Sequence, residues 1–248
     1  MRILRLDRTV TYRTSGPGIP RIESEIHARL LDDAPQLLMS SELGTVVVFH
    51  ELDLPAGRPD VVVANATLRA FDLRRRARIE PVTAPATAAV AASLRQRGKA
   101  TAAALVLRGQ SGLAAAQVSR ALAELLRKRV VQTDGETYWT HPSWQVLADE
   151  VVAVEAKVEG WRAAAQQARS WEWLVNGSYL AFPSEYFGKV PRAQLALRRF
   201  GLIEVKKDGI VVPRRPRWRT VTSTREVLVD EAMYARWLAE RALLADGS

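Results

Sequence analysis

Two short valine-rich runs, at residues 61–64 and 151–154, have the composition of buried β-strands. The chain changes character between them, because residues 84–143 are rich in alanine and carry apolar residues at helical spacing. Strand-like runs with the same valine-rich composition resume after this segment. We therefore predict an α/β domain, formed by residues 1–83 and 144–248, that a mostly helical domain at 84–143 interrupts.

The rest of the pattern predicts a mixed sheet flanked by helices. The Asp-Gly pair at 208–209 favours a hairpin between strands at 202–205 and 210–212. Further strands are predicted at 45–49 and 178–182, and helices at about 22–31, 161–175, 192–199 and 230–244.

The composition is that of a globular chain, with 48% hydrophobic and 25% charged residues. There is no cysteine, so disulfides and thiolate metal sites are excluded. The histidines, His27, His50 and His141, lie far apart in the sequence, and we expect any metal to be a hard cation held by carboxylates. We see neither a secretory signal nor an apolar run of the roughly 18 residues that a membrane span needs. We therefore expect a cytoplasmic protein that does not associate with membranes.

The positive charge is large and clustered. The formal net charge is +9, and the segment 94–129 carries eight Lys or Arg residues against one acid. A second segment, 189–219, carries ten against two. Clustered cations on a globular chain are typical of nucleic-acid binding, although a solvated surface of an arginine-rich protein gives the same count. We expect double-stranded DNA as the partner.

The segment 101–129 has the pattern of two helices joined by a short glycine-containing turn. Its second helix places Val118, Leu122, Leu125 and Leu126 on one face. Polar and cationic side chains fall outside that face, as in a helix that enters the major groove of DNA. The sequence at 130–139 has the pattern of a two-stranded wing. The residues expected to contact DNA are Lys99, Gln117, Ser119, Arg120, Arg127, Lys128 and Arg129.

This segment resembles the winged helix-turn-helix domains of bacterial regulators, with residues 116–125 carrying the likeness. The resemblance covers about a fifth of the chain, and it implies DNA contact through the second helix. Helix-turn-helix patterns also arise in ordinary three-helix packing. A purely structural or protein-binding module is therefore the alternative.

Three charged residues lie at the ends of the two valine-rich runs. Asp60 precedes the first run, and Glu155 and Lys157 follow the second. If the runs pair as antiparallel strands, the start of the first meets the end of the second, and Asp60 and Glu155 stand side by side. Two carboxylates so placed can hold Mg²⁺ or Mn²⁺, and Lys157 can stabilise negative charge or activate a water molecule. The alternatives are a turn aspartate and an exposed ion pair on an edge strand.

The motif Pro59-Asp60, followed by Glu155-Ala156-Lys157, resembles that of the PD-(D/E)xK nuclease superfamily. The likeness extends to an acidic helix upstream and a glutamine-containing helix downstream. The resemblance implies a restriction-endonuclease-like mixed sheet with Glu25 and Gln167 completing the catalytic set, Glu23 and Gln166 being close rivals. The 95-residue gap between Asp60 and Glu155 departs from a direct hairpin, and removing the insertion shortens it to an ordinary loop.

Two functions of different classes follow from these features. The first is a magnesium-dependent DNA endonuclease, or nuclease-fold DNA-processing protein, in which the winged helix grips duplex DNA. The alternative is a non-enzymatic transcriptional regulator whose inactive nuclease-like core serves as a scaffold or forms a homodimer. A protein-interaction adaptor is a third interpretation.

Overall fold

The computed structural model describes residues 2–6, 23–40, 44–107, 113–191, 193–194 and 199–246. The chain divides into two compact units that alternate along the sequence. The sheet unit consists of Met1–Ala66 and Ala148–Thr220, and the helical unit of Thr67–Leu147 and Val221–Ser248. Most of the predicted helix at 192–199 lies outside the described residues, as does the turn at 109–112.

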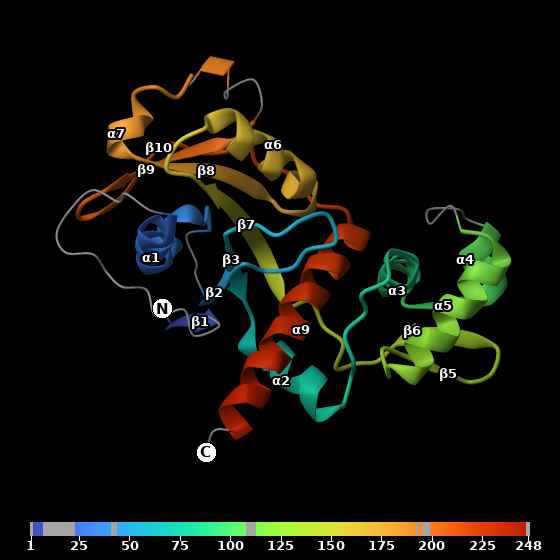
Figure 1. Cartoon of the computed structure of the whole chain (residues 1–248). Coiled ribbons are helices and arrows are strands. Elements are labelled where there is room, and N and C mark those ends of the chain that lie inside the picture. Colours follow the sequence, from blue (N-terminus) through green and yellow to red (C-terminus); the bar gives the residue numbers. More distant parts are fainter. Residues whose placement is uncertain are drawn as a thin grey trace. The chain divides into compact units, whose positions relative to one another are not determined.

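The sheet unit contains a mixed seven-stranded sheet in the order β1-β2-β3-β7-β8-β9-β10 (Figure 1). The β2–β3, β3–β7 and β9–β10 pairs are antiparallel, and the other neighbours are parallel. The strands are β1 (Arg2–Leu6), β2 (Thr45–His50), β3 (Val61–Ala66), β7 (Ala148–Ala156), β8 (Gly177–Pro183), β9 (Gly201–Lys206) and β10 (Gly209–Arg214). Its helices are α1 (Glu23–Asp33), η1 (Ala34–Leu37), α6 (Trp161–Trp171), η2 (Glu172–Leu174) and α7 (Ser184–Phe187). The prediction of a mixed sheet flanked by helices is confirmed.

Helices cover both faces of this sheet. Ile26 and Leu30 of α1 pack in one core with alternate residues of the strands. These strand residues include Val46, Val48, Val61, Val63, Val152, Val154, Tyr179, Ala181, Ile203 and Val205. On the other side, α6 packs against β7 and β8 and buries Ala164, Ala165 and Ala168 (Figure 1). Burial on both faces explains why the central strands are valine-rich throughout.

The two valine-rich runs pair as predicted. β3 and β7 are antiparallel neighbours, with Val61 opposite Val154 at one end and Ala66 opposite Ala148 at the other. The chain leaves the sheet after Ala66 and returns at Ala148, so the insertion enters at the end of the pair that is opposite Asp60 and Glu155.

The helical unit contains five helices and a three-stranded sheet in the order β4-β6-β5 among the described residues. Its elements are α2 (Leu68–Arg76), α3 (Pro85–Arg97), β4 (Lys99–Thr101), α4 (Ala102–Leu107), α5 (Ala115–Arg127), β5 (Val131–Thr133), β6 (Thr137–Thr140) and α9 (Ser223–Asp246). Within the described ranges, none of the helices of the protein combines the length and the apolar character that a bilayer crossing requires.

The helical unit extends beyond the predicted insertion at 84–143, because α2 and the C-terminal helix α9 belong to it as well. The ring of Phe71 on α2 lies 5.4 Å from that of Trp237 and 6.3 Å from that of Tyr234, both on α9. Arg95 on α3 forms a 2.8 Å ion pair with Glu226. Apolar and ionic contacts of this kind join segments that are far apart in the sequence, so sequence periodicity did not reveal them.

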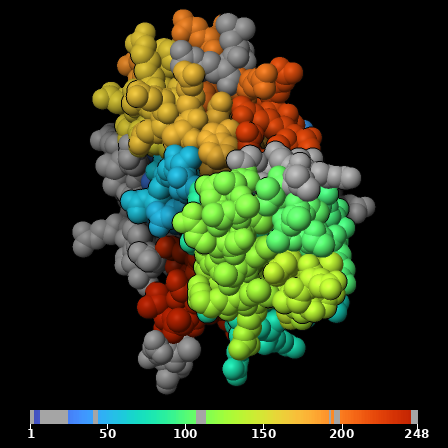
Figure 2. Space-filling model, turned by 90° about the vertical axis from the view of Figure 1, so that its right-hand side faces the viewer, coloured from blue at the N-terminus to red at the C-terminus, as the bar shows by residue number. Residues whose placement is uncertain are grey.

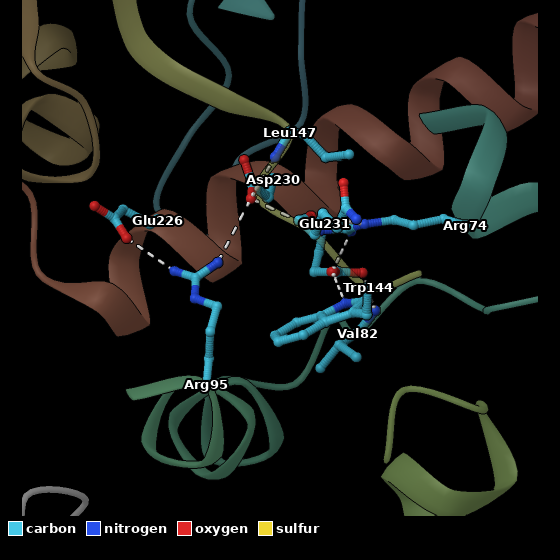
Figure 3. A network of polar contacts seen from close by, with 9 residues as sticks. Arg74, Val82, Arg95, Trp144, Leu147, Glu226, Asp230 and Glu231 are labelled. Atoms are coloured by element: carbon cyan, nitrogen blue, oxygen red, sulfur yellow. Dashed lines mark hydrogen bonds and ion pairs between the residues drawn. The ribbon is translucent and has the colours of Figure 1, made fainter. Parts of the chain in front are cut away.

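A buried carboxylate, Glu231 on α9, connects three segments of the helical unit (Figure 3). Its Oε1 lies 2.6 Å from Nη1 of Arg74, a residue with no exposed surface, and accepts a 2.8 Å hydrogen bond from Nε1 of Trp144. Its Oε2 accepts a 2.8 Å bond from the backbone N–H of Val82. A buried ion pair such as Arg74–Glu231 is tolerated in a core only when the remaining polar atoms of its members have hydrogen-bond partners, as both carboxylate oxygens of Glu231 do.

The neighbouring carboxylate, Asp230, is equally buried but less fully compensated (Figure 3). Its Oδ2 accepts a 3.1 Å hydrogen bond from the backbone N–H of Leu147, and the guanidinium groups of Arg74 and Arg95 lie 3.7 and 3.8 Å away. Burial raises the pKa of Asp230 to about 7, against the lowering effect of Arg74, Arg95 and the Leu147 bond.

We predict that Arg74→Met lowers the free energy of unfolding of the helical unit by about 3 to 5 kcal/mol, because it leaves Asp230 and Glu231 buried without their main counter-charge. Urea denaturation, with hydrogen-exchange mass spectrometry of peptides from this unit, measures the loss. Arg75→Met is the matched control: Arg75 is half-exposed, and its ion pair among the described residues is with Asp72, so its change stays within about 0.5 kcal/mol. Equal effects of the two variants would contradict the prediction.

Asp230 also predicts a pH dependence. Its folded pKa of about 7 lies above the ordinary value of 3.8, so the folded state holds a proton that the unfolded state releases between these values. The resulting stabilisation is fully present below about pH 4 and is lost as the pH rises through 7. The unfolding free energy of wild type, minus that of Asp230→Asn, is expected to fall by about 1.4 kcal/mol per pH unit near pH 5.5. Parallel pH profiles of the two proteins would refute this.

Candidate functional site

Asp60 stands immediately before β3 and is held by both neighbouring strands. Its backbone carbonyl accepts a 2.9 Å hydrogen bond from the N–H of Glu51, just after β2, and Oδ2 of its carboxylate accepts a 2.7 Å bond from the N–H of Ala156 on β7. The strand pairing ends with Val61 opposite Val154, so Asp60 and Glu155 are the next residues of the two chain segments at this end. The fold thus brings the two predicted metal ligands to adjacent strand ends.

Glu155 and Lys157 form an ion pair at the same end of the sheet. Nζ of Lys157 lies 3.3 Å from Oε1 of Glu155. The Glu155 side chain is only 2% exposed and that of Lys157 is 20% exposed. Side chains alternate along a strand, so Glu155 points to the sheet face opposite Val154, the face on which α6 packs. The predicted pair is therefore real but lies on a central strand, not on an exposed edge.

Two histidines that are not among the predicted site residues, His27 and His50, lie close to Asp60. Nδ1 of His27, on α1, is 3.0 Å from Nε2 of His50, the last residue of β2, and both rings are buried. Nε2 of His27 lies 3.7 Å from Oδ2 of Asp60, beyond hydrogen-bonding distance. The distance between the histidines along the sequence gave no sign of this contact, which forms because α1 and β2 meet in the fold although the two residues are 23 positions apart.

The Asp60 carboxylate is stabilised in its ionised form. Burial acts to raise its pKa, but the interaction with His27, the hydrogen bond from Ala156 and the charge of Lys157 outweigh burial and lower the pKa below 3.8. Asp60 is therefore an anion at neutral pH, as a ligand for a hard cation must be.

The other two residues of the predicted catalytic set lie on the flanking helices. Glu25 precedes His27 by two residues on α1, so the two side chains leave the helix about 200° apart. Gln167 and Gln166 are both exposed on α6, outside its buried alanine face. Glu23 is the first residue of α1, and its side chain lies outside the described set.

The elements from α3 to β6 are three helices and a three-stranded sheet. They follow one another as α3, β4, α4, α5, β5 and β6, and β6 pairs with both β4 and β5. The helix α5 buries Val118, Leu122 and Leu125, as its periodicity predicts, and Leu126 is partly buried. The surfaces of α5 and of the β5–β6 hairpin face the viewer together in Figure 2.

The residues expected to contact DNA differ in the contacts that they make within the protein. Gln117, Ser119 and Arg120 are exposed on α5; Oε1 of Gln117 accepts a bond from the N–H of Ala114, and Nε of Arg120 donates to the carbonyl of Ala116. Arg129 is exposed and has a left-handed backbone, with φ of 59°.

Three of the expected cations are paired with carboxylates. Lys99 lies 2.9 Å from Asp134, Arg127 lies 3.0 Å from Glu80, and Lys128 lies 3.6 Å from Glu124. Asp134 also accepts hydrogen bonds from the backbone and hydroxyl of Thr137, and these bonds, with Lys99, hold its pKa well below the usual range. The turn between β5 and β6 therefore carries a fixed negative charge beside Lys99.

Comparison with known proteins identifies no relative. No protein-family model and no curated protein matches the chain. One solved structure, a protein of unknown function from Silicibacter pomeroyi, aligns with 38% of this chain and 60% of its own length, at 20% identity and a TM-score of 0.28. A TM-score at that level carries no argument about fold or function.

Proposed function

We propose that the protein is a metal-dependent DNA nuclease of the PD-(D/E)xK type, with a winged helix-turn-helix unit that holds duplex DNA. The observation that supports the proposal is the antiparallel pairing of β3 with β7, because Asp60 precedes β3 at the same end at which Glu155 and Lys157 stand on or just after β7. The order α1, β2, β3, β7, α6 and β8 supports it, since the predicted acidic helix, strand trio, glutamine helix and final strand occur in that sequence.

The carboxylates at this strand end fit a hard divalent cation. Asp60 is ionised, and its neighbour Glu155 supplies a second carboxylate on the adjacent strand. Among the described residues, no group of three or more His, Asp or Glu side chains has the arrangement of a metal site. The proposal is that Asp60 and Glu155 hold Mg²⁺ or Mn²⁺, with water or phosphate oxygens as further ligands, and that the ion would polarise the scissile phosphate.

Lys157 has a defined role in this proposal. Its ammonium group is partly exposed and pairs with Glu155, so it is positioned to stabilise negative charge that develops on a phosphate or on an attacking water. The proposal keeps the cytoplasmic location that the lack of cysteine favours. Glu25 and Gln167 remain proposed members of the catalytic set.

Exposed groups on α5 support duplex DNA as the substrate. Gln117, Ser119 and Arg120 are exposed on the helix, outside its apolar face. Arg120 is the strongest candidate for a phosphate contact, because its guanidinium group has no carboxylate partner among the described residues. We expect a smaller contribution to DNA binding from Lys99, Arg127 and Lys128, since binding phosphate would require them to leave their present carboxylate partners.

A specific observation favours the alternative, a DNA-binding regulator with an inactive core. Glu155 is almost fully buried, and one of its oxygens is already paired with Lys157. The buried Glu155–Lys157 ion pair has a purely structural role unless a metal ion displaces the lysine from the carboxylate. The two functions differ in one measurable property, which is hydrolysis.

We predict that the protein nicks supercoiled plasmid DNA in Mg²⁺ or Mn²⁺ and does not do so in EDTA. Asp60→Asn and Lys157→Met should each lower the rate at least about a hundredfold, because each removes a group that acts on the phosphate or its metal. Asp149→Asn is the matched control, since Asp149 is an exposed aspartate on the same strand, β7, far from Glu155. Absence of nicking under all metal conditions, with DNA binding retained, would establish the regulator instead.

A second prediction concerns DNA binding. Arg120→Ala should weaken binding to duplex DNA similarly across sequences, and the salt dependence of log K should decrease by about 0.9, the value for one phosphate contact. Arg162→Ala removes one exposed cation from α6 of the sheet unit, so it controls for net charge and should leave the slope unchanged. Fluorescence anisotropy at several salt concentrations measures both. Identical slopes for Arg120→Ala and wild type would reject this surface of α5 as a phosphate-binding surface.

A further inference from the structure

A buried nitrogen atom beside Asp60 lacks a hydrogen-bond partner. The His27 side chain is 8% exposed, and its Nε2 makes no hydrogen bond among the described residues. The nearest acceptor is Oδ2 of Asp60, 3.7 Å away. Buried polar atoms are almost always satisfied, so an orphan at this position requires a physical explanation.

The contact between the two histidines suggests which tautomer His27 adopts. Nδ1 of His27 and Nε2 of His50 are 3.0 Å apart, so a single proton lies between them. If His50 supplied that proton, Nε2 of neutral His27 would carry a proton directed at the carboxylate, and a bond near 2.9 Å would be expected instead of the 3.7 Å separation. If His27 supplies it, Nε2 presents a lone pair towards Asp60.

A lone pair and a carboxylate that face each other repel unless a positive ion or a hydrogen-bond donor lies between them, and a divalent ion would bind both atoms directly. Two ligand atoms each about 2.1 Å from one ion, at a tetrahedral angle, are about 3.4 Å apart, a few tenths of an ångström less than the separation seen here. Metal-binding histidines also donate their second ring N–H to a fixed acceptor, which is the role that Nε2 of His50 would have.

We propose that Nε2 of His27 and the Asp60 carboxylate bind one divalent transition-metal ion, and that His50 holds His27 in the metal-binding tautomer. The proposal rests on the proposed function in that Asp60 is the same metal-binding carboxylate. It adds a nitrogen ligand, which makes the site prefer first-row transition ions to Mg²⁺, because imidazole is a poor ligand for Mg²⁺. Asp60 is 14% exposed, so water can reach the ion.

The test uses Mn²⁺ and the full-length protein. Electron spin echo envelope modulation of bound Mn²⁺ should show coupling to ¹⁴N, and this should change to ¹⁵N coupling in protein made with ¹⁵N-histidine. Isothermal titration should show Mn²⁺ binding at least about tenfold tighter than Mg²⁺. His27→Gln should remove both the nitrogen coupling and the preference, whereas His141→Gln, which changes the histidine of the helical unit, should preserve both.

The outcomes separate this inference from the nuclease proposal. Bound Mn²⁺ without nitrogen coupling would overturn the role of His27 and leave the carboxylate site standing, and so would coupling that survives His27→Gln. No Mn²⁺ binding at all would also overturn it, while Mg²⁺-dependent nicking would still support the nuclease. Histidine coupling in a protein that cuts no DNA would support the inference and refute nuclease activity. The isotope comparison uses wild-type protein, so it decides the matter even if His27→Gln fails to fold.

Discussion

The register between β3 and β7 determines the position of every candidate residue in the sheet unit. Side chains alternate along a strand, so a slip of one residue would exchange the two faces and move Val61 and Val154 out of the core. The same slip would separate Asp60 from the N–H of Ala156, which its carboxylate caps. Burial on both faces makes that slip costly, and the core therefore fixes the relation between Asp60 and Glu155.

This register survives an insertion of about 80 residues because the insertion returns close to where it starts. The backbone N–H of Thr67 donates a 2.8 Å hydrogen bond to the carbonyl of Leu147, one residue from each end of the β3–β7 pairing. An unstructured loop of that length, compared with a four-residue turn, would cost about 2.5 kcal/mol in closure entropy. The helical unit avoids that cost by folding, and Asp230 on α9 holds Leu147 at the closing point.

Features that depend on local periodicity could be predicted from the sequence, and features that depend on tertiary pairing could not. Composition identified the valine-rich strands, and helical spacing identified the buried side of α5. By contrast, His27 and His50 are 23 residues apart, and Arg127 and Glu80 are 47 apart. Charge counts treat Arg127 as a free cation because counting carries no information about which carboxylate lies next to it. The placement of α9 in the helical unit depends on Phe71, Tyr234 and Trp237, whose contacts are equally non-local.

Charge state and geometry at Asp60 have the same structural origin. The hydrogen bond from the Ala156 N–H both continues the pairing of β3 with β7 and helps to keep the Asp60 carboxylate ionised. The interactions that fix where Asp60 lies are thus the ones that keep it anionic. A substitution that loosens the strand pairing would therefore weaken cation binding even if every side chain at the site were retained, because the carboxylate would lose its orientation and part of its negative charge together.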